Sequence, residues 1–218
     1  MDVSDAVHHR KSVRAFLDTP VPDETVRALL TAAARAPSGG NVQPWRMYVV
    51  NGDRMTDFLT FMEGRDFDTP EYEVYPANLW DPYRTNRFAL GEAMYATMGI
   101  PREDKEARFA HLARNYRFFD APVGMVVTID RFLKIGSWLD LGMFLQNVMV
   151  AARGHGLHTC PQAAFAPYHD TIRAALGIPA EQVVVCGMAL GHVDPDVPEH
   201  RLDTERAAVD EFCTFLEE

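Results

Sequence analysis

The chain has few cysteines, no long apolar run and fewer basic than acidic residues, and each scarcity excludes a class of protein. Three cysteines among 218 residues are too few and too scattered for a disulfide framework, which favours a reducing compartment. No stretch approaches the roughly 20 apolar residues of a membrane-spanning helix. The opening MDVSDAVHHRK lacks the apolar centre of a signal peptide. We therefore expect a soluble, cytoplasmic protein.

The shortage of basic residues also limits the kinds of molecule that the protein can bind. Lysine and arginine number 21 against 31 acidic residues, which leaves a net charge of −10. A nucleic acid or an anionic membrane surface would be repelled by that field, so neither is an expected partner. Hydrophobic residues make up 47% of the chain, and a chain of this length can bury a sizeable core. The simplest organisation is a single domain over residues 1–218.

Apolar periodicity predicts an α+β fold in which helices alternate with about four strands. The predicted strands cover residues 45–50, 122–130, 157–162 and 183–190. One short predicted helix ends near residue 9. The other predicted helices cover residues 22–36, 87–98, 101–117, 137–153 and 168–176. Asn51-Gly52-Asp53 has the composition of a turn. A sandwich with helices on both faces of the sheet fits this order of elements.

Two segments depart from ordinary amphipathic patterning. Residues 64–86 are polar, aromatic and interrupted by proline, and a loop of that length in a compact domain is usually functional or mobile. The helix at 137–153 is apolar almost all round, so it cannot face water. It belongs either in the core alone or in the core and at a subunit interface, and the sequence leaves both open.

A basic motif at residues 10–14 is the first candidate for chemistry. Arg10, Lys11, Ser12 and Arg14 place three cations and a hydroxyl within five residues. The planar fork of arginine suits phosphate oxygens, and the serine adds a donor. The alternative is a solvated basic run, although a concentrated basic motif is less expected by chance in so acidic a chain.

The second candidate is the loop at residues 37–45, which reads Pro-Ser-Gly-Gly-Asn-Val-Gln-Pro-Trp. Two glycines allow a ligand to approach the backbone closely, and Ser38, Asn41 and Gln43 supply polar groups. The alternative is an ordinary turn between a helix and a strand.

Four motifs in this order resemble those of one family. Arg-Lys-Ser-x-Arg-x-Phe at 10–16, followed by the 37–45 loop, resembles the amino-terminal signature of the nitroreductase family of FMN enzymes. Ser137-x-x-Asp140-x-Gly142 resembles its central helix, and residues 160–165 resemble its loop over the flavin. Leu190-Gly191-His192, with Arg201 further on, resembles its closing phosphate segment. The resemblance implies a sandwich with a mostly antiparallel sheet flanked by helices, in an intertwined homodimer.

The resemblance also assigns roles around FMN. Arg10, Lys11 and Ser12 would bind the phosphate and ribityl chain, with Arg201 closing on the phosphate. Arg14 would approach the pyrimidine edge of the flavin, where a fixed cation stabilises the negative charge that reduction produces. The residues that would reach the flavin of the partner subunit are Pro37, Ser38, Gly39, Asn41 and Gln43.

The remaining implied contacts lie around the flavin ring. Pro161 and Gln162 belong to the loop over the ring, and backbone N–H groups of Ala163 and Ala164 would point at flavin O4 and N5. Many relatives have Glu-Gly at these two alanines, and a backbone donor survives that change. Asn115 would meet the edge of the ring.

A dedicated nicotinamide domain is not indicated, because no Gly-x-Gly-x-x-Gly follows a predicted strand. In the family NADH or NADPH and the acceptor take turns over one flavin face, which implies a ping-pong reaction. The acceptor would be a quinone or a nitroaromatic compound, with nitrobenzoate-like compounds among the latter. The variable region 64–118 would form the lid, with substrate contacts from Trp80, Tyr83, Arg84 and Arg87. Packing of the loop is the alternative role for these aromatic residues.

Two other functions and one other kind of site are alternatives. A flavin-dependent reductive dehalogenase of halophenols would use a lid of the type Glu92, Tyr95 and Lys105, although their spacing is not convincing. A flavin-binding module without turnover is a second alternative. His155, His158 and Cys160 could be read as metal ligands, but a fourth ligand is missing, and we expect no metal.

Overall fold

A computed structural model describes residues 1–216 of the chain. Its centre is a four-stranded sheet in the order β1-β2-β4-β3, and every neighbouring pair is antiparallel. The strands are β1 (Trp45–Asn51), β2 (Val123–Asp130), β3 (His158–Gln162) and β4 (Gln182–Gly191). The predicted α+β fold with a largely antiparallel sheet is confirmed.

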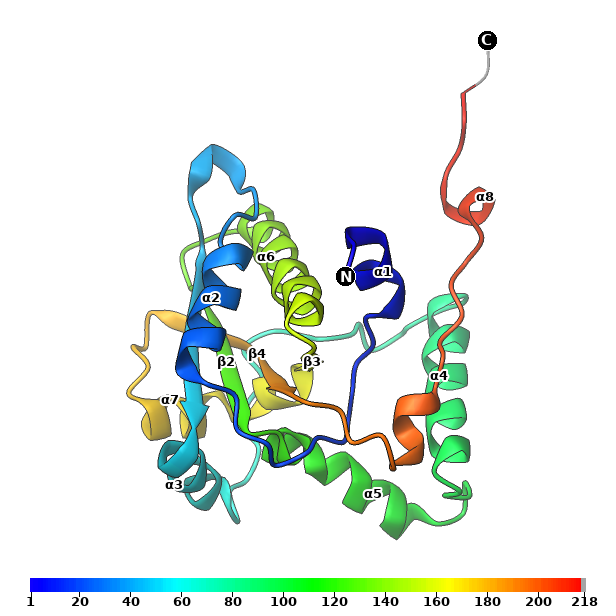
Figure 1. Cartoon of the computed structure of the whole chain (residues 1–218), viewed down its shortest axis with the longest axis horizontal. Coiled ribbons are helices and arrows are strands. Elements are labelled where there is room, and N and C mark those ends of the chain that lie inside the picture. Colours follow the sequence, from blue (N-terminus) through cyan, green and yellow to red (C-terminus); the bar gives the residue numbers. More distant parts are fainter. Residues whose placement is uncertain (217–218) are drawn as a thin grey trace.

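Helices cover both faces of this sheet (Figure 1). On one face α2 (Asp23–Ala33) and α6 (Ile135–Gly154) share a core with Met125 and Val127 of β2. On the other face α3 (Gly52–Met62) and α7 (His169–Leu176) pack near Val126. The alternation along β2 follows from the two-residue period of a strand, and burial on both faces explains why this strand is apolar throughout.

The other elements lie around this sandwich. They are the helices α1 (Val3–His9), α4 (Tyr83–Thr97), α5 (Lys105–Ala113) and α8 (Val209–Phe212), and the short 3-10 helices η1 (Gly39–Asn41), η2 (Arg114–Asp120), η3 (Ala163–Tyr168) and η4 (Pro198–Arg201). Figure 1 shows α4 and α5 at one side of the molecule, with the carboxy-terminal tail running past α4 and away from the sheet. No helix among the described residues is both long enough and apolar enough to cross a membrane.

Helix α6 has two different apolar faces. Leu141, Phe144 and Val148, spaced three and four residues apart, are buried against the sheet. On the opposite side Ile135 is 79% exposed and Leu139 is 69% exposed. The helix is therefore part of the core, and its outer face is uncovered in the single chain.

Several predicted boundaries are wrong. The helix predicted at 87–98 begins earlier, at Tyr83, inside the segment predicted to be a loop. Asn51-Gly52-Asp53 is not a turn, because Asn51 ends β1 and helix α3 begins at Gly52. The helix was missed although Met55, Phe58 and Met62 have helical spacing and are all buried.

The helix predicted to begin at Pro101 begins four residues later. Asp104 precedes α5, and its side chain accepts a hydrogen bond of 2.9 Å from the N–H of Ala107. An aspartate cap is a stronger start signal than the proline before it. The α-helix ends at Ala113, and the chain continues from Arg114 as the 3-10 helix η2, in which the buried Phe118 and Phe119 adopt positive φ angles.

Candidate functional site

The basic motif is an extended segment that lies along the edge of the sheet formed by β3. Ser12 forms a parallel bridge with Thr159 of β3, and the N–H of Val13 donates to the carbonyl of Thr159 at 3.0 Å. Further on, the N–H of Leu17 donates to the carbonyl of His192 just after β4. Residues 10–14 are thus placed beside the strand that leads into the loop at 160–165.

Arginines of the motif surround the buried Cys160. Burial raises the pKa of Cys160 to about 11, and the nearby Arg14 and Arg10 act in the opposite direction. A guanidinium N–H of Arg14 donates to the carbonyl of Ser12 at 3.2 Å. The thiol is therefore a buried core group, and the cations beside it are positioned by the backbone around it.

Phe165, the last residue of the loop at 160–165, anchors this loop against β4. This ring is fully buried, and a Cβ at Gly187 of β4 would collide with it. Gln162 is 2% exposed, and its side-chain amide donates to the carbonyl of Asn115 at 2.7 Å. The predicted residues Asn115 and Gln162 are thus neighbours. Ala163 and Ala164 begin η3, where the N–H groups of a first turn have no partner within the helix.

A cluster of five basic side chains lies at the carboxyl end of α6 and the start of β3. A guanidinium N–H of Arg153 is 2.7 Å from Nε2 of His158 and donates to it. Burial lowers the pKa of His158 to about 4, and the further causes are Arg153, His192, His200 and Lys11. We call Lys11, Arg153, His158, His192 and His200 the cation cluster.

The cation cluster has few carboxylates. Lys11 forms an ion pair of 2.5 Å with Asp203, whose side chain is 86% exposed. Within residues 1–216, Arg153 forms no ion pair, and the buried atoms Arg153 Nε and His158 Nδ1 have no hydrogen-bond partner. Burying positive groups without an anion is costly, so the arrangement suits a bound anion. Sequence reasoning missed Arg153 and His158 as members of this site.

The segment that carries Arg201 is attached to the basic motif. The ammonium of Lys11 donates to the carbonyl of His200 at 3.3 Å, next to Arg201 in η4. Arg201 itself is exposed. The motifs at 10–14, 160–165 and 198–203 are therefore brought to one region, as expected from the sequence. Their individual contacts with a cofactor remain predictions.

The loop at 37–43 lies elsewhere. The N–H of Gly39 donates to Asp140 at 3.2 Å, near the amino end of α6, and the hydroxyl of Ser38 accepts from the N–H of Gln43 at 3.0 Å. Asp140 and Arg153 are 13 residues apart on one helix, which corresponds to about 20 Å at 1.5 Å per residue. One chain therefore does not bring this loop to its own cation cluster.

The four predicted substrate residues lie at the start of α4 and are exposed. Trp80 is 69% exposed and Tyr83 is 58% exposed. Arg84 pairs with Asp81 at 2.7 Å, and the guanidinium of Arg87 lies 4.4 Å from the ring centroid of a neighbouring tyrosine, Tyr75. None of these contacts reaches the loop at 160–165, so their role stays a prediction.

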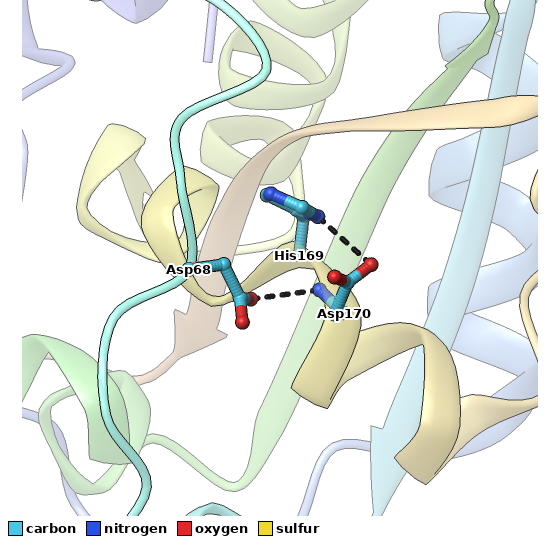
Figure 2. Close-up of side chains that lie close together, drawn as sticks. All are labelled: Asp68, His169 and Asp170. Carbon is cyan, nitrogen blue, oxygen red and sulfur yellow. Dashed lines mark hydrogen bonds and ion pairs between the residues drawn. The ribbon is translucent and has the colours of Figure 1, made fainter.

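A second group of polar side chains resembles a metal site. Asp68, His169 and Asp170 lie close together, as Figure 2 shows. Nε2 of His169 lies 2.8 Å from the carbonyl of Thr69 and must donate to it, which leaves Nδ1 as an acceptor. Arg173 donates to that Nδ1 at 2.8 Å.

The carboxylates of this group are occupied too. Asp68 accepts from the N–H of Asp170 at 2.8 Å, and Asp170 accepts from Arg173 at 2.8 Å. The group therefore ties the segment around residue 68 to α7. Both imidazole nitrogens of His169 are used in these contacts, so the histidine offers no free nitrogen to a metal.

Comparison with known proteins assigns the family. The Nitroreductase family model matches residues 7–192, and the chain belongs to the nitroreductase family. It is 40% identical to nitrobenzene nitroreductase of Ectopseudomonas oleovorans, over 99% of this chain and 97% of that protein. It is 39% identical to 4-nitrobenzoate reductase of Nocardioides sp. (strain LMS-CY), over 96% and 88%.

A solved structure agrees with these relatives. The FMN and NADPH-dependent nitroreductase NfnB from "sphigopyxis sp. strain HMH" superposes with a TM-score of 0.95 at 41% identity, over 100% of both chains. The fold and the family predicted from the four motifs are thereby confirmed.

Proposed function

We propose that this chain is an FMN-dependent oxidoreductase that transfers electrons from NADH or NADPH to nitroaromatic acceptors, including nitrobenzoate-like ones, or to quinones. The observation that carries the proposal is the cation cluster beside the loop at 160–165. It occurs in a chain about 40% identical to nitrobenzene and nitrobenzoate reductases over nearly its whole length.

The described side chains fit one phosphate. Arg10, Lys11 and Ser12 lie on the segment that runs beside β3, and η4 places Arg201 next to the carbonyl that Lys11 binds. A phosphate dianion would supply the negative charge that Arg153 lacks and an acceptor for the free Nδ1 of the neutral His158. This donor set accounts for a mononucleotide, and Arg201 would close over it.

The flavin ring would lie over the loop at 160–165. FMN, when bound, supplies the hydride chemistry, and the protein positions and tunes it. The N–H groups of Ala163 and Ala164 are oriented by η3 and would donate to the ring, with Pro161 beneath it. Arg14 would hold a fixed positive charge at the pyrimidine edge.

We also propose a homodimer with shared sites. The loop at 37–43 is about 20 Å along α6 from the cation cluster, so it would serve the cofactor of the partner. The exposed apolar residues on the outer face of α6 would be covered by the second copy. The uncovered Ile135, Leu139 and Met143 support this arrangement.

The acceptor would be bound by residues at and just before the amino end of α4. Trp80 and Tyr83 offer aromatic surfaces, and Arg87 offers a cation for a carboxylate or nitro group. The dehalogenase alternative loses support, because Glu92 accepts hydrogen bonds of 2.6 and 3.2 Å from the two terminal guanidinium nitrogens of Arg108. That carboxylate is committed within the protein and is not presented to a substrate.

Anaerobic stopped-flow absorbance of the FMN-loaded protein tests the proposal. We expect NADPH or NADH to bleach the bound flavin rapidly and a nitrobenzoate to restore its colour. Steady-state lines at several fixed acceptor concentrations should be parallel, since donor and acceptor use one site in turn. Intersecting lines with a trapped ternary complex would contradict the ping-pong sequence, and a flavin that is never bleached would leave only a binding module.

A further inference from the structure

Glu199 is a buried carboxylate on η4 that no expected cofactor contact explains. Its side chain is 7% exposed, and its Oε1 accepts a hydrogen bond of 3.2 Å from a guanidinium N–H of Arg114. The same oxygen lies 3.9 Å from Nδ1 of His111. A buried carboxylate is costly unless it is paired, so Glu199 holds η4 against the end of α5 and the start of η2.

His111 extends this contact to α4. It is 7% exposed, and its ring meets the ring of Tyr95 edge to face at a centroid distance of 6.0 Å. Burial lowers the pKa of His111, as do Arg114 and Arg14, whereas Glu199 acts in the opposite direction. Among residues 1–216 its buried Nε2 has no hydrogen-bond partner. The imidazole is thus a neutral, buried contact between the two helices and η4.

Helices α4 and α5 are joined to each other by a second set of contacts. Arg108 of α5 binds Glu92 of α4 through two nitrogens, and its guanidinium lies 4.3 Å from the ring centroid of Tyr95. Arg108 also donates to the carbonyl of Pro101 in the connection between the helices. We call residues 83–114, which include the residue Arg114 that caps the end of α5, the lid hairpin, because these contacts make α4 and α5 one unit.

The other end of the η4 segment is attached to the basic motif. Lys11 donates to the carbonyl of His200 and pairs with Asp203. Arg201 therefore lies between two attachments, one to the lid hairpin through Glu199 and one to the basic motif through Lys11. A shift of either attachment would move Arg201.

We propose that Glu199 is a positioning residue that links the lid hairpin to the segment carrying Arg201, so that acceptor binding and phosphate binding depend on one carboxylate. The proposal rests on the proposed function for its two ligands. Glu199 itself needs to touch neither ligand. Its loss would free Arg114 and His111 on one side and η4 on the other.

The test compares Glu199→Gln and Glu199→Ala with Glu205→Gln, a control at an exposed position of the same tail. In the FMN-loaded protein we expect Glu199→Ala to raise the Kd of FMN and the KM of a nitrobenzoate, each by roughly tenfold, with kcat changed much less. Glu199→Gln keeps the volume and a hydrogen-bond acceptor, so it should show the same pattern more weakly. The control should match the wild type.

Two further measurements separate positioning from general instability. Hydrogen exchange should become faster in both 107–120 and 196–203 in the Glu199 variants, while the strands keep their protection. In a double-mutant cycle, Arg114→Ala should add little to Glu199→Ala, because both remove one interaction. Faster exchange in only one segment, or a KM and Kd equal to those of the wild type, would overturn the proposal.

Failure of the proposed function gives a different result. A protein that binds no FMN would still show coupled exchange of the two segments if Glu199 links them. Coupled exchange without FMN binding would therefore contradict the proposed function and keep the link. FMN binding with uncoupled exchange would keep the function and overturn the link.

Discussion

Two clusters built from arginine and histidine lie in different parts of the molecule, and their carboxylates distinguish them. Around His169, Arg173 is paired with Glu71 at 2.5 Å and with Asp170 at 2.8 Å, and Arg131 also reaches Glu71. Around His158, the neighbouring Arg153 has no carboxylate partner among the described residues. Both clusters contain arginine and histidine, but only the cluster around His169 has carboxylates that balance the charge of its arginines.

This difference identifies which cluster can take a ligand. Although burial raises the pKa of Glu71, hydrogen bonds from Arg173 and Arg131 bring it below its ordinary value, so that the carboxylate stays ionised. That cluster is complete without a ligand and ties the segment before the lid to α7. The cation cluster has buried donors to spare and would be completed by the phosphate of FMN.

The largest effect is expected from unbalancing the complete cluster. Glu71→Gln would remove the more buried of the two carboxylates that pair with Arg173 and leave only the exposed Asp170, so we expect it to lower the free energy of unfolding by about 3 kcal/mol. Denaturant unfolding measures this loss, with the exposed Glu73→Gln as control. FMN affinity should be unaltered once the protein is folded. A large change in FMN affinity would show that the two clusters are not separate.

Arg201→Ala should act on binding and hardly on folding. Loss of one charge-assisted phosphate contact should weaken FMN binding by about 1.5–3 kcal/mol. The visible spectrum of the flavin that remains bound should be unchanged, because the phosphate is distant from the ring. Fluorescence titration measures the Kd, and Arg206→Ala on the same exposed tail is the control. An unchanged affinity would remove Arg201 from the phosphate site.

The cation cluster also predicts a pH dependence of stability without FMN. The pKa of His158 is about 4 in the folded protein, below its ordinary value of 6.5, so the unfolded chain binds more protons between these values. Stability should therefore fall as the pH decreases from 6.5 to 4. The His158 contribution should be about 2 kcal/mol, less than the full shift implies because the residue keeps some contact with water.

His158→Gln should flatten this part of the stability profile, measured by urea unfolding at a series of pH values. His155→Gln, three residues away and exposed, should leave it unchanged. An equally steep profile in the His158 variant would assign the loss of stability to other groups.

The smallest effect is expected in the lid. Arg87→Ala should raise the KM of a carboxylated nitroarene by about two- to fivefold relative to a neutral one, since an exposed charge contributes only about 0.2–1 kcal/mol. Arg84→Ala should do less, because Arg84 is already paired with Asp81. Initial rates with the two acceptors measure the ratio. Equal responses to both acceptors would exclude an electrostatic part for the lid.

The sequence predicts the strands and the helices that cover both faces of the sheet well. In β2 and on the inner face of α6, the apolar residues of the sequence are the residues that the fold buries. The sequence does not predict α3, because Asn51-Gly52-Asp53 has the composition of a turn. In the structure Asn51 precedes the helix and Gly52 begins it. The start of α5 is misplaced for a related reason, since Pro101 is a weaker signal than the cap at Asp104.

The site shows a similar division. The short motifs at 10–14 and 160–165 are recognisable as linear patterns, and the structure places them side by side. Arg153 and His158 are not recognisable in this way, because their role depends on the missing carboxylates around them in space. The sequence offers for His158 only a metal-ligand interpretation that fails for want of a fourth ligand, and in the structure its Nε2 is bound by Arg153. The contact between Glu199 and Arg114 joins residues 85 positions apart and has no local signal.

The most direct test of this account is the affinity of the flavin-free wild-type protein for FMN compared with riboflavin, measured by isothermal titration calorimetry. The two ligands share the ring and the ribityl chain and differ by the phosphate. If the cation cluster with Arg10, Lys11, Ser12 and Arg201 binds that phosphate, riboflavin should bind at least about 100-fold more weakly than FMN. Equal affinities would contradict the account, because Arg153 and the basic motif would then have no part in holding the phosphate of the cofactor.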